Sequence, residues 1–188
     1  MERKIVYFEK PGKENTDAVM AIVKQRAAEL GIKTIVVASY QGYTALRAVD
    51  TLQGLKVVVI AGRRDPTKEN IADGIPEKDK KYIEGKGGIV YVSTHLFSGL
   101  SGAMRKKFNT CIIGDVMAST LRIFGSGIKV CVEMAAMAAD AGLVRTDEDT
   151  ICVAGSRSGA DAAAVIRPAT SSNIFDMKVQ EILCKPLL

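Results

Sequence analysis

The chain of 188 residues is 47% hydrophobic and 25% charged, which predicts one globular domain over residues 1–188 and excludes a disordered protein. Much of its net charge of +5 sits in short basic clusters, such as Arg105-Lys106-Lys107, that alternate with acidic or apolar residues. A nucleic-acid interface more often forms a basic stripe with interleaved aromatic residues, so we predict no nucleic-acid partner.

The four cysteines lie far apart in the sequence, without a C-x-x-C pair, and the chain has one histidine. A structural zinc site needs about four N or S ligands at short paired spacings, so we predict no metal site. Free cysteines in apolar runs are typical of a reduced, cytoplasmic protein. No apolar run approaches the roughly 20 residues of a membrane span, and the charged, strand-like residues 1–10 do not resemble a signal peptide. We therefore expect a cytoplasmic protein without a membrane partner.

Strand and helix patterns alternate in the first third of the chain. Near-continuous apolar runs are typical of strands that are covered on both faces, and Gly31 is a helix stop signal. A β-α-β-α-β series of this kind implies right-handed crossovers and a parallel sheet. The predicted elements are a strand at Lys4–Phe8, a helix from Asn15 or Thr16 to Leu30, a strand at Lys33–Ala38, a helix at Tyr43–Leu52 and a strand at Lys56–Ala61.

The rest of the chain begins with a polar excursion over residues 62–74. Ala162–Pro168 could be a helix by its alanines, but Val165-Ile166, Pro168 and the hydroxyl-rich stretch after it favour a return strand. The other predicted elements are a helix at Pro76–Glu84, a strand at Ile89–Val92, an interrupted helical region over 103–124, an apolar helix at Ile128–Ala141, a strand at 150–154 and a final strand at Val179–Cys184.

Two of the predicted strands run into turns rich in glycine and hydroxyl residues. The first turn is Ser39-Tyr40-Gln41-Gly42-Tyr43-Thr44, and the second is Gly155-Ser156-Arg157-Ser158-Gly159. Such turns offer free backbone N–H groups and glycines that let an anion approach the main chain. Ligands of open α/β sheets bind beyond the carboxyl ends of the strands. The two turns therefore predict a binding site for a phosphorylated small molecule.

The turn at Ser39–Thr44 is the stronger candidate. Gly42 can adopt the positive φ of a tight turn, and Tyr43 and Thr44 begin a helix whose first N–H groups lack intrahelical partners. The alternative is a serine-capped turn without a ligand.

The turn at Gly155–Gly159 adds a guanidinium, Arg157, that can pair with phosphate or carboxylate. Hairpins use the same residue types, so a ligand-free hairpin is the alternative. The pattern also resembles the G-x-S-x-G nucleophile elbow of hydrolases. Because arginine occupies the serine position, that interpretation fails.

Three further residues are candidates for the same crevice. His95 and Gly99 follow the strand at Ile89–Val92, which places them at a carboxyl end, although a lone histidine is often structural. Lys129, after Gly125-Ser126-Gly127, could oppose a phosphate or face solvent, with Glu133 one helical turn away. Met134 and Met137 are interpreted as core residues rather than a flavin platform.

Three stretches resemble the C-terminal α/β domain of pyruvate kinase: Thr34–Ala48, Ala136–Gly155 and Gly155–Pro168. The resemblance implies a three-layer α/β sandwich with a mostly parallel sheet and an antiparallel edge. It also implies that Ser39–Thr44 grips a sugar phosphate. Because that domain contributes to subunit contacts, a homo-oligomer is expected, with the Ile128–Ala141 helix as one candidate interface. Residues 63–86 and 101–120 depart from the resemblance.

Four more stretches resemble a family of stand-alone prokaryotic proteins of this fold, some associated with bound FMN: Lys4–Gly12, Thr94–Gly99, Ile128–Glu133 and Gly159–Pro168. The resemblance implies that FMN is the cofactor. Its phosphate would lie on Ser39–Thr44, and His95, Gly99 and Gly155–Gly159 would surround its ribityl chain or ring.

Two functional hypotheses follow. The first is an FMN-binding domain which, if it is an enzyme, is a flavin-dependent oxidoreductase of unknown substrate. The alternative is a non-catalytic module that binds a sugar-phosphate effector. The kinase reaction is excluded, because 188 residues without an eight-fold βα series cannot contain the roughly 250-residue catalytic barrel.

Overall fold

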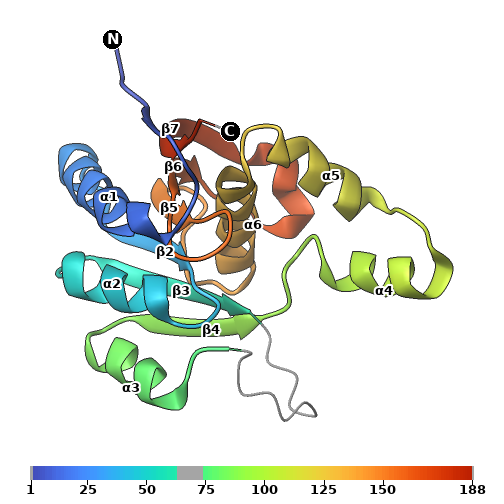
Figure 1. Ribbon diagram of the computed structural model, residues 1–188, viewed down its shortest axis with the longest axis horizontal. Coiled ribbons are helices and arrows are strands. Elements are labelled where there is room, and N and C mark those ends of the chain that lie inside the picture. Colours follow the sequence, from blue (N-terminus) through green and yellow to red (C-terminus); the bar gives the residue numbers. More distant parts are fainter. Residues whose placement is uncertain (1, 63–73, 188) are drawn as a thin grey trace.

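A computed structural model describes residues 2–62 and 74–187, so the predicted polar excursion lies almost wholly outside the described residues. The described strands form one seven-stranded sheet in the order β1-β7-β6-β5-β2-β3-β4, and helices cover both of its faces (Figure 1). This is the predicted three-layer α/β sandwich. The strands are β1 (Val6–Phe8), β2 (Thr34–Ala38), β3 (Lys56–Gly62), β4 (Ile89–Ser93), β5 (Thr150–Ala154), β6 (Ala162–Arg167) and β7 (Lys178–Pro186).

The helices also follow the sequence prediction. The interrupted helical region is two helices, α4 and α5, which project from the body of the domain (Figure 1). The first of them ends at Asn109, whose φ of 47° lies in the left-handed region. Two short 3-10 helices, η1 and η2, were not predicted. The helical elements are η1 (Lys13–Asn15), α1 (Thr16–Leu30), α2 (Tyr43–Thr51), α3 (Glu77–Gly85), α4 (Gly99–Phe108), α5 (Ile113–Arg122), α6 (Ser126–Asp140) and η2 (Ser171–Asp176).

The sheet is parallel except at β6. Strand β2 pairs in parallel with both β3 and β5, and β3 pairs in parallel with β4. Strand β6 is antiparallel to both β5 and β7. The choice of a return strand for residues 162–167 is therefore confirmed, despite the alanines. Strand β1 pairs in parallel with β7, so three strands separate it from β2, although the two are consecutive strands in the chain.

Alternate residues of the central strands enter two different cores. In β2, Ile35 and Val37 pack with α1 and α2, whereas Val36 packs with α6 on the opposite face. All three side chains are fully buried. The period of two is the geometry of a strand, and burial on both faces explains the continuous apolar run in the sequence.

Most side chains of helix α6 are apolar, and they pack against the sheet of the same chain. Met134 and Met137 are buried in the core that α6 forms with the sheet. The apolar character of the Ile128–Ala141 stretch therefore reflects packing on the sheet, and it does not indicate a subunit interface. None of the described helices has the length and apolar character needed to cross a membrane.

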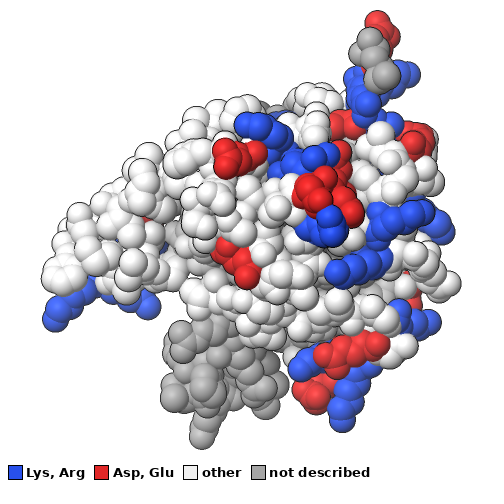
Figure 2. Space-filling view, turned by 180° about the vertical axis from the view of Figure 1, so that it is seen from behind, with Lys and Arg blue, Asp and Glu red and all other residues white. Residues whose placement is uncertain are grey.

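Large exposed apolar side chains occur instead on and beside α4 and α5. Leu100, Phe108, Ile113 and Ile123 are between 63% and 78% exposed. Figure 2 shows few charged residues over these helices, at its left side, whereas charges of both signs cover the opposite side. A homo-oligomer stays a prediction, and the exposed apolar surface that it could use lies here rather than on α6.

Replacement of Gly159 by alanine should destabilise the protein more than the same change at Gly142. Both glycines have positive φ, 74° and 67°, and a left-handed alanine costs about 1–2 kcal/mol. A Cβ at Gly142 would have no neighbour within 4 Å, whereas one at Gly159 would collide with the backbone of Lys13. We expect Gly159→Ala to lower the free energy of unfolding by about 1–3 kcal/mol more than Gly142→Ala, measured by urea denaturation. Equal losses would contradict the close packing of this loop on η1.

Candidate functional site

A cavity of about 400 Å³ lies where β2, β3, β4 and β5 end. Because these strands are parallel, their carboxyl ends meet at one edge of the sheet. Strand β3 lies on one side of β2, and β5 lies on the other side. This is the topological switch point at which open α/β sheets bind ligands. The lining residues are Ala38, Ser39, Tyr40, Gln41, Tyr43, Thr44, Ile60, Gly62, His95, Val130, Gly155, Arg157, Ser158 and Gly159.

The cavity brings together residues of both predicted turns and His95. Four predicted site residues lie outside the lining: Gly42, Gly99, Lys129 and Ser156. Six lining residues were not predicted as site residues: Ala38, Tyr40, Gln41, Ile60, Gly62 and Val130. Tyr40 and Gln41 stand inside the predicted turn, so their position was a usable signal. The apolar ones resemble any buried residue in the sequence.

The first turn has the serine cap that one of the two alternatives predicted. Ser39 is buried, and its Oγ accepts a hydrogen bond from the backbone N–H of Ala45 at 3.2 Å, so it does cap the turn. Gly42 has a φ of 95° and precedes α2. The N–H groups of Tyr43 and Thr44 have no acceptor among the residues that the structure describes. The capped turn therefore still presents two backbone donors and the positive end of a helix dipole.

The buried carboxylate of Asp161 binds the backbone of the second turn on the side of the protein interior. Asp161 accepts hydrogen bonds from the backbone N–H of Ser156 at 3.1 Å and from its hydroxyl at 3.3 Å. It also accepts one from the N–H of Gly12 at 3.1 Å. Burial raises the pKa of Asp161, against the opposing effect of these donors. Ser156 therefore supports the turn from inside, and Asp161 is a supporting residue that no sequence motif signalled.

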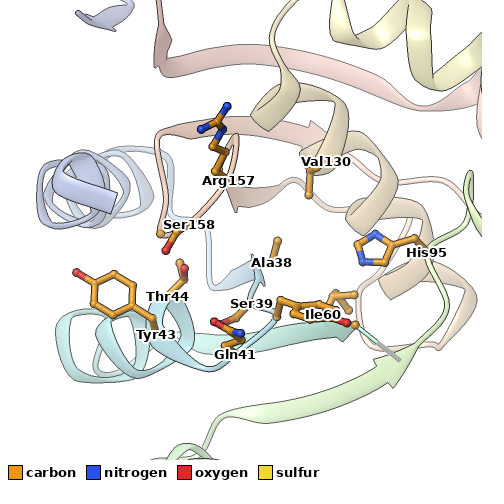
Figure 3. A pocket seen from close by; sticks show the side chains of 14 residues that line it. Ala38, Ser39, Gln41, Tyr43, Thr44, Ile60, His95, Val130, Arg157 and Ser158 are labelled. Atoms are coloured by element: carbon orange, nitrogen blue, oxygen red, sulfur yellow. The ribbon is translucent and has the colours of Figure 1, made fainter. Parts of the chain in front are cut away.

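Arg157 and Ser158, in the middle of this turn, line the cavity. Figure 3 shows the Ser158 hydroxyl directed toward Thr44, across the space between the two turns. In the same view the guanidinium of Arg157 is directed away from Thr44 and Ser39. Arg157 is exposed, and its side chain has no hydrogen-bonding or ionic partner in the described part of the chain. A long side chain with this freedom can turn toward an anion at the rim.

His95 lies at the end of the cavity that is remote from α2, and it contacts the buried ion pair of Lys129 and Glu133. Its Nδ1 lies 3.2 Å from Oε2 of Glu133, which is fully buried. Lys129, 6% exposed, donates to the same oxygen at 2.5 Å, and its ammonium lies 5.4 Å from the ring centre of Phe97. Phe97 N–H donates to Oε1 at 2.8 Å. Lys129 therefore neither faces solvent nor reaches the cavity.

These donors set the ionisation of Glu133. Burial by itself would raise the pKa of this carboxyl group. The hydrogen bonds from His95 and Lys129, the Lys129 charge and the Phe97 N–H outweigh burial and lower the pKa to about 2. Glu133 is therefore an anion at neutral pH. The spacing of Lys129 and Glu133 in the sequence indicated a helical pair, but not its burial or its contact with His95.

The edge of parallel strands, the switch point and the two turns define an open α/β domain with a cavity at its switch point. The family model "Pyruvate kinase, alpha/beta domain" matches residues 17–166, and the chain belongs to this family. Two solved structures of Cryptosporidium parvum pyruvate kinase are similar to the chain. The one in complex with ADP is 13% identical, with 78% of this chain and 21% of that chain covered and a TM-score of 0.37. The other is 14% identical, with 77% and 21% covered and a TM-score of 0.35. The chain thus spans about a fifth of the length of these enzymes, and the family assignment rests on the family model.

Replacement of Glu133 by glutamine should produce a pH-dependent loss of stability. The change leaves Lys129 charged and buried without its partner, which typically costs about 3–5 kcal/mol. The carboxyl pKa is about 2 in the folded protein and roughly 4.3 in an unfolded chain. The stabilisation is therefore present above the unfolded value and is lost as the pH falls toward 2.

Urea denaturation at a series of pH values measures this effect. The difference between wild type and Glu133→Gln should be largest near pH 7 and should shrink below the unfolded pKa. Glu148→Gln, at a side chain that is 66% exposed, is the control and should change stability little at any pH. A difference that does not vary with pH would contradict the lowered pKa.

Proposed function

We propose that this domain binds a phosphorylated cofactor, with FMN as the first candidate, in the cavity at the carboxyl ends of β2 to β5. The observation that carries the proposal is the pair of turns that face each other across the cavity, one of which presents the unpaired N–H groups of Tyr43 and Thr44. Backbone donors at the start of a helix form a site that favours an anion. The hydroxyl groups of Thr44 and Ser158 lie on opposite sides of the same space (Figure 3).

The remaining lining suits the rest of such a cofactor. Ile60 and Val130 supply apolar surface, Tyr40 an aromatic ring, and His95 a polar group at the end remote from α2. A volume of about 400 Å³ is within the range of sites for small molecules. When bound, a flavin supplies redox chemistry of its own. If the domain is an enzyme, it would then be a flavin-dependent oxidoreductase.

The alternative is an effector module for a sugar phosphate. It is supported by the same two turns and by the membership of the pyruvate kinase α/β domain family. Arg157 adds a permanent charge at the rim, which suits a small, doubly charged ligand as well as a cofactor.

The purified protein separates the two hypotheses. If the domain binds FMN, the purified protein should be yellow or should bind added FMN in a fluorescence titration. It should then release FMN on denaturation. A thermal-shift comparison with sugar bisphosphates gives the second arm. A colourless protein that does not bind FMN would reject the cofactor hypothesis, and no response to any sugar phosphate would reject the effector module.

Replacement of Thr44 by valine should weaken phosphate binding selectively. Thr44 is 4% exposed and lines the cavity, and valine keeps its shape while the hydroxyl is lost. The affinity for FMN, measured by isothermal titration calorimetry, should fall by about 1.5–3 kcal/mol, the usual contribution of a hydrogen bond to a charged group. Thr120→Val removes an exposed helix hydroxyl, which bonds Val116 at 2.9 Å, and should leave the affinity unchanged. If both variants bind like the wild type, Thr44 has no role beyond the turn.

Replacement of Arg157 by alanine should weaken FMN more than riboflavin, which has no phosphate. The guanidinium acts on the phosphate at the solvent-exposed rim, so the difference between the two ligands should decrease as salt is added. Arg122→Ala removes the same charge from α5, away from the cavity lining, and is the matched control. Equal losses for FMN and riboflavin would place Arg157 beside the ring, and unchanged binding of both would show that it does not contact the ligand.

A further inference from the structure

The two nitrogens of His95 have different surroundings. Nδ1 lies 3.2 Å from the Glu133 carboxylate, on the side of α6. Figure 3 shows the ring at the edge of the cavity, with its other nitrogen directed to the side of Ile60 and Ser39. This nitrogen, Nε2, has no hydrogen-bond partner among the residues that the structure describes.

The surroundings of Glu133 determine which nitrogen carries the proton. An ionised carboxylate can only accept hydrogen bonds. Its other contacts, the ammonium of Lys129 and the N–H of Phe97, are donors. In the neutral ring the proton must then lie on Nδ1, which leaves the lone pair of Nε2 directed into the cavity.

The ion pair with Lys129 shows what Glu133 contributes. The ammonium balances the negative charge of the carboxylate inside the protein, so His95 is not needed to neutralise it. What remains is orientation: the carboxylate holds the ring in one rotamer and in one tautomer. This ring has one nitrogen bound within the protein and the other presented to the cavity.

We propose that His95 is the proton acceptor of this cavity, and that Glu133 is a positioning residue that keeps its Nε2 unprotonated. The proposal rests on the proposed function, because it takes the cavity to be the site of a phosphorylated ligand. It adds the chemical class of that ligand: a molecule with its phosphate on the Ser39–Thr44 turn and an ionisable O–H, N–H or activated C–H group at the opposite end.

The proton transfer balances without a co-reactant. The X–H bond of the ligand breaks, the proton forms a new bond with Nε2, and the electron pair stays on the ligand. The ring becomes an imidazolium, whose Nδ1–H still donates to the anionic Glu133, so the new positive charge is stabilised by the carboxylate. In the reverse direction the same Nε2–H returns the proton.

The single histidine of the chain makes the tautomer directly measurable. Long-range ¹H–¹⁵N NMR spectra of ¹⁵N-labelled protein, recorded at a pH where the ring is neutral, contain the signals of one imidazole. The ring should be predominantly protonated on Nδ1, opposite to the preference of free histidine in water. A ring that is predominantly protonated on Nε2 would overturn the proposal.

A double variant, Lys129→Met/Glu133→Leu, tests the role of the carboxylate, because it removes both charges of the buried pair together and leaves no side-chain acceptor for Nδ1–H at position 133. The Nδ1–H tautomer should lose its predominance in this variant and keep it in the exposed control, Glu148→Gln. An unchanged tautomer in the double variant would show that Glu133 does not position the ring.

Ligand contact is tested with FMN and with diethyl pyrocarbonate, a reagent that acylates an unprotonated imidazole nitrogen. We expect one modified imidazole per chain, none in His95→Gln, and at least about tenfold slower modification at saturating FMN, as for a general base covered by its ligand. Bound FMN should also shift the Nε2 signal more than the Nδ1 signal. If FMN binds and changes neither the Nε2 signal nor the modification rate, the proton-acceptor role is wrong while the proposed function stands. If FMN and sugar phosphates do not bind at all, the proposed function fails, although the tautomer result remains valid.

Discussion

The parallel pairing of β2 with both β3 and β5 is the constraint on which the rest of the molecule depends. It places three carboxyl ends at one edge, to which the parallel pairing of β3 with β4 adds a fourth. The chain continues from β2 to β3 on one side of β2, and β5 lies on the other side. The two glycine-rich turns, more than a hundred residues apart in the sequence, therefore face each other. The cavity is a consequence of this pairing, and neither turn could form it alone.

The antiparallel strand β6 constrains the second of these turns. After the second turn the chain must reverse direction at once to pair with β5, and Gly155 and Gly159 permit that reversal in very little space. The side chain of Asp161 is buried under the turn and binds the N–H groups of Ser156 and Gly12. A buried carboxylate with several donors rigidifies the backbone around it. The backbone of the turn is thus preorganised, and the ligand proposed for this cavity would bind it at a lower entropic cost.

At the end of the cavity that contains His95, a buried ion pair holds the neighbouring groups in place. The Lys129–Glu133 pair links α6 to the segment after β4 through the N–H of Phe97 and the ring of His95. Such a pair is weak evidence for stability, since the desolvation of both charges offsets much of their attraction. Its value here is geometric, because it holds the ring of His95 in one orientation at the edge of the cavity.

The local features of this protein could be predicted from its amino-acid sequence. Apolar runs located the strands, Gly42 and Gly31 marked turns with positive φ, and the order of elements implied a parallel sheet. Such features depend on neighbours along the chain, whose preferences a pattern records. The serine cap and the positive φ of Gly42 in the turn at Ser39–Thr44 could be predicted in the same way.

The partners of residues that lie far apart in the sequence could be found only in the folded chain. Lys129 turned out to pair with a buried carboxylate, Ser156 to bind Asp161, and β1 to lie beside β7 rather than β2. A spacing of four residues shows that Lys129 and Glu133 can meet, but it does not show whether water or another strand covers them. Burial, and with it the ionisation of Glu133 and the orientation of His95, depends on which distant segments pack on that face of α6.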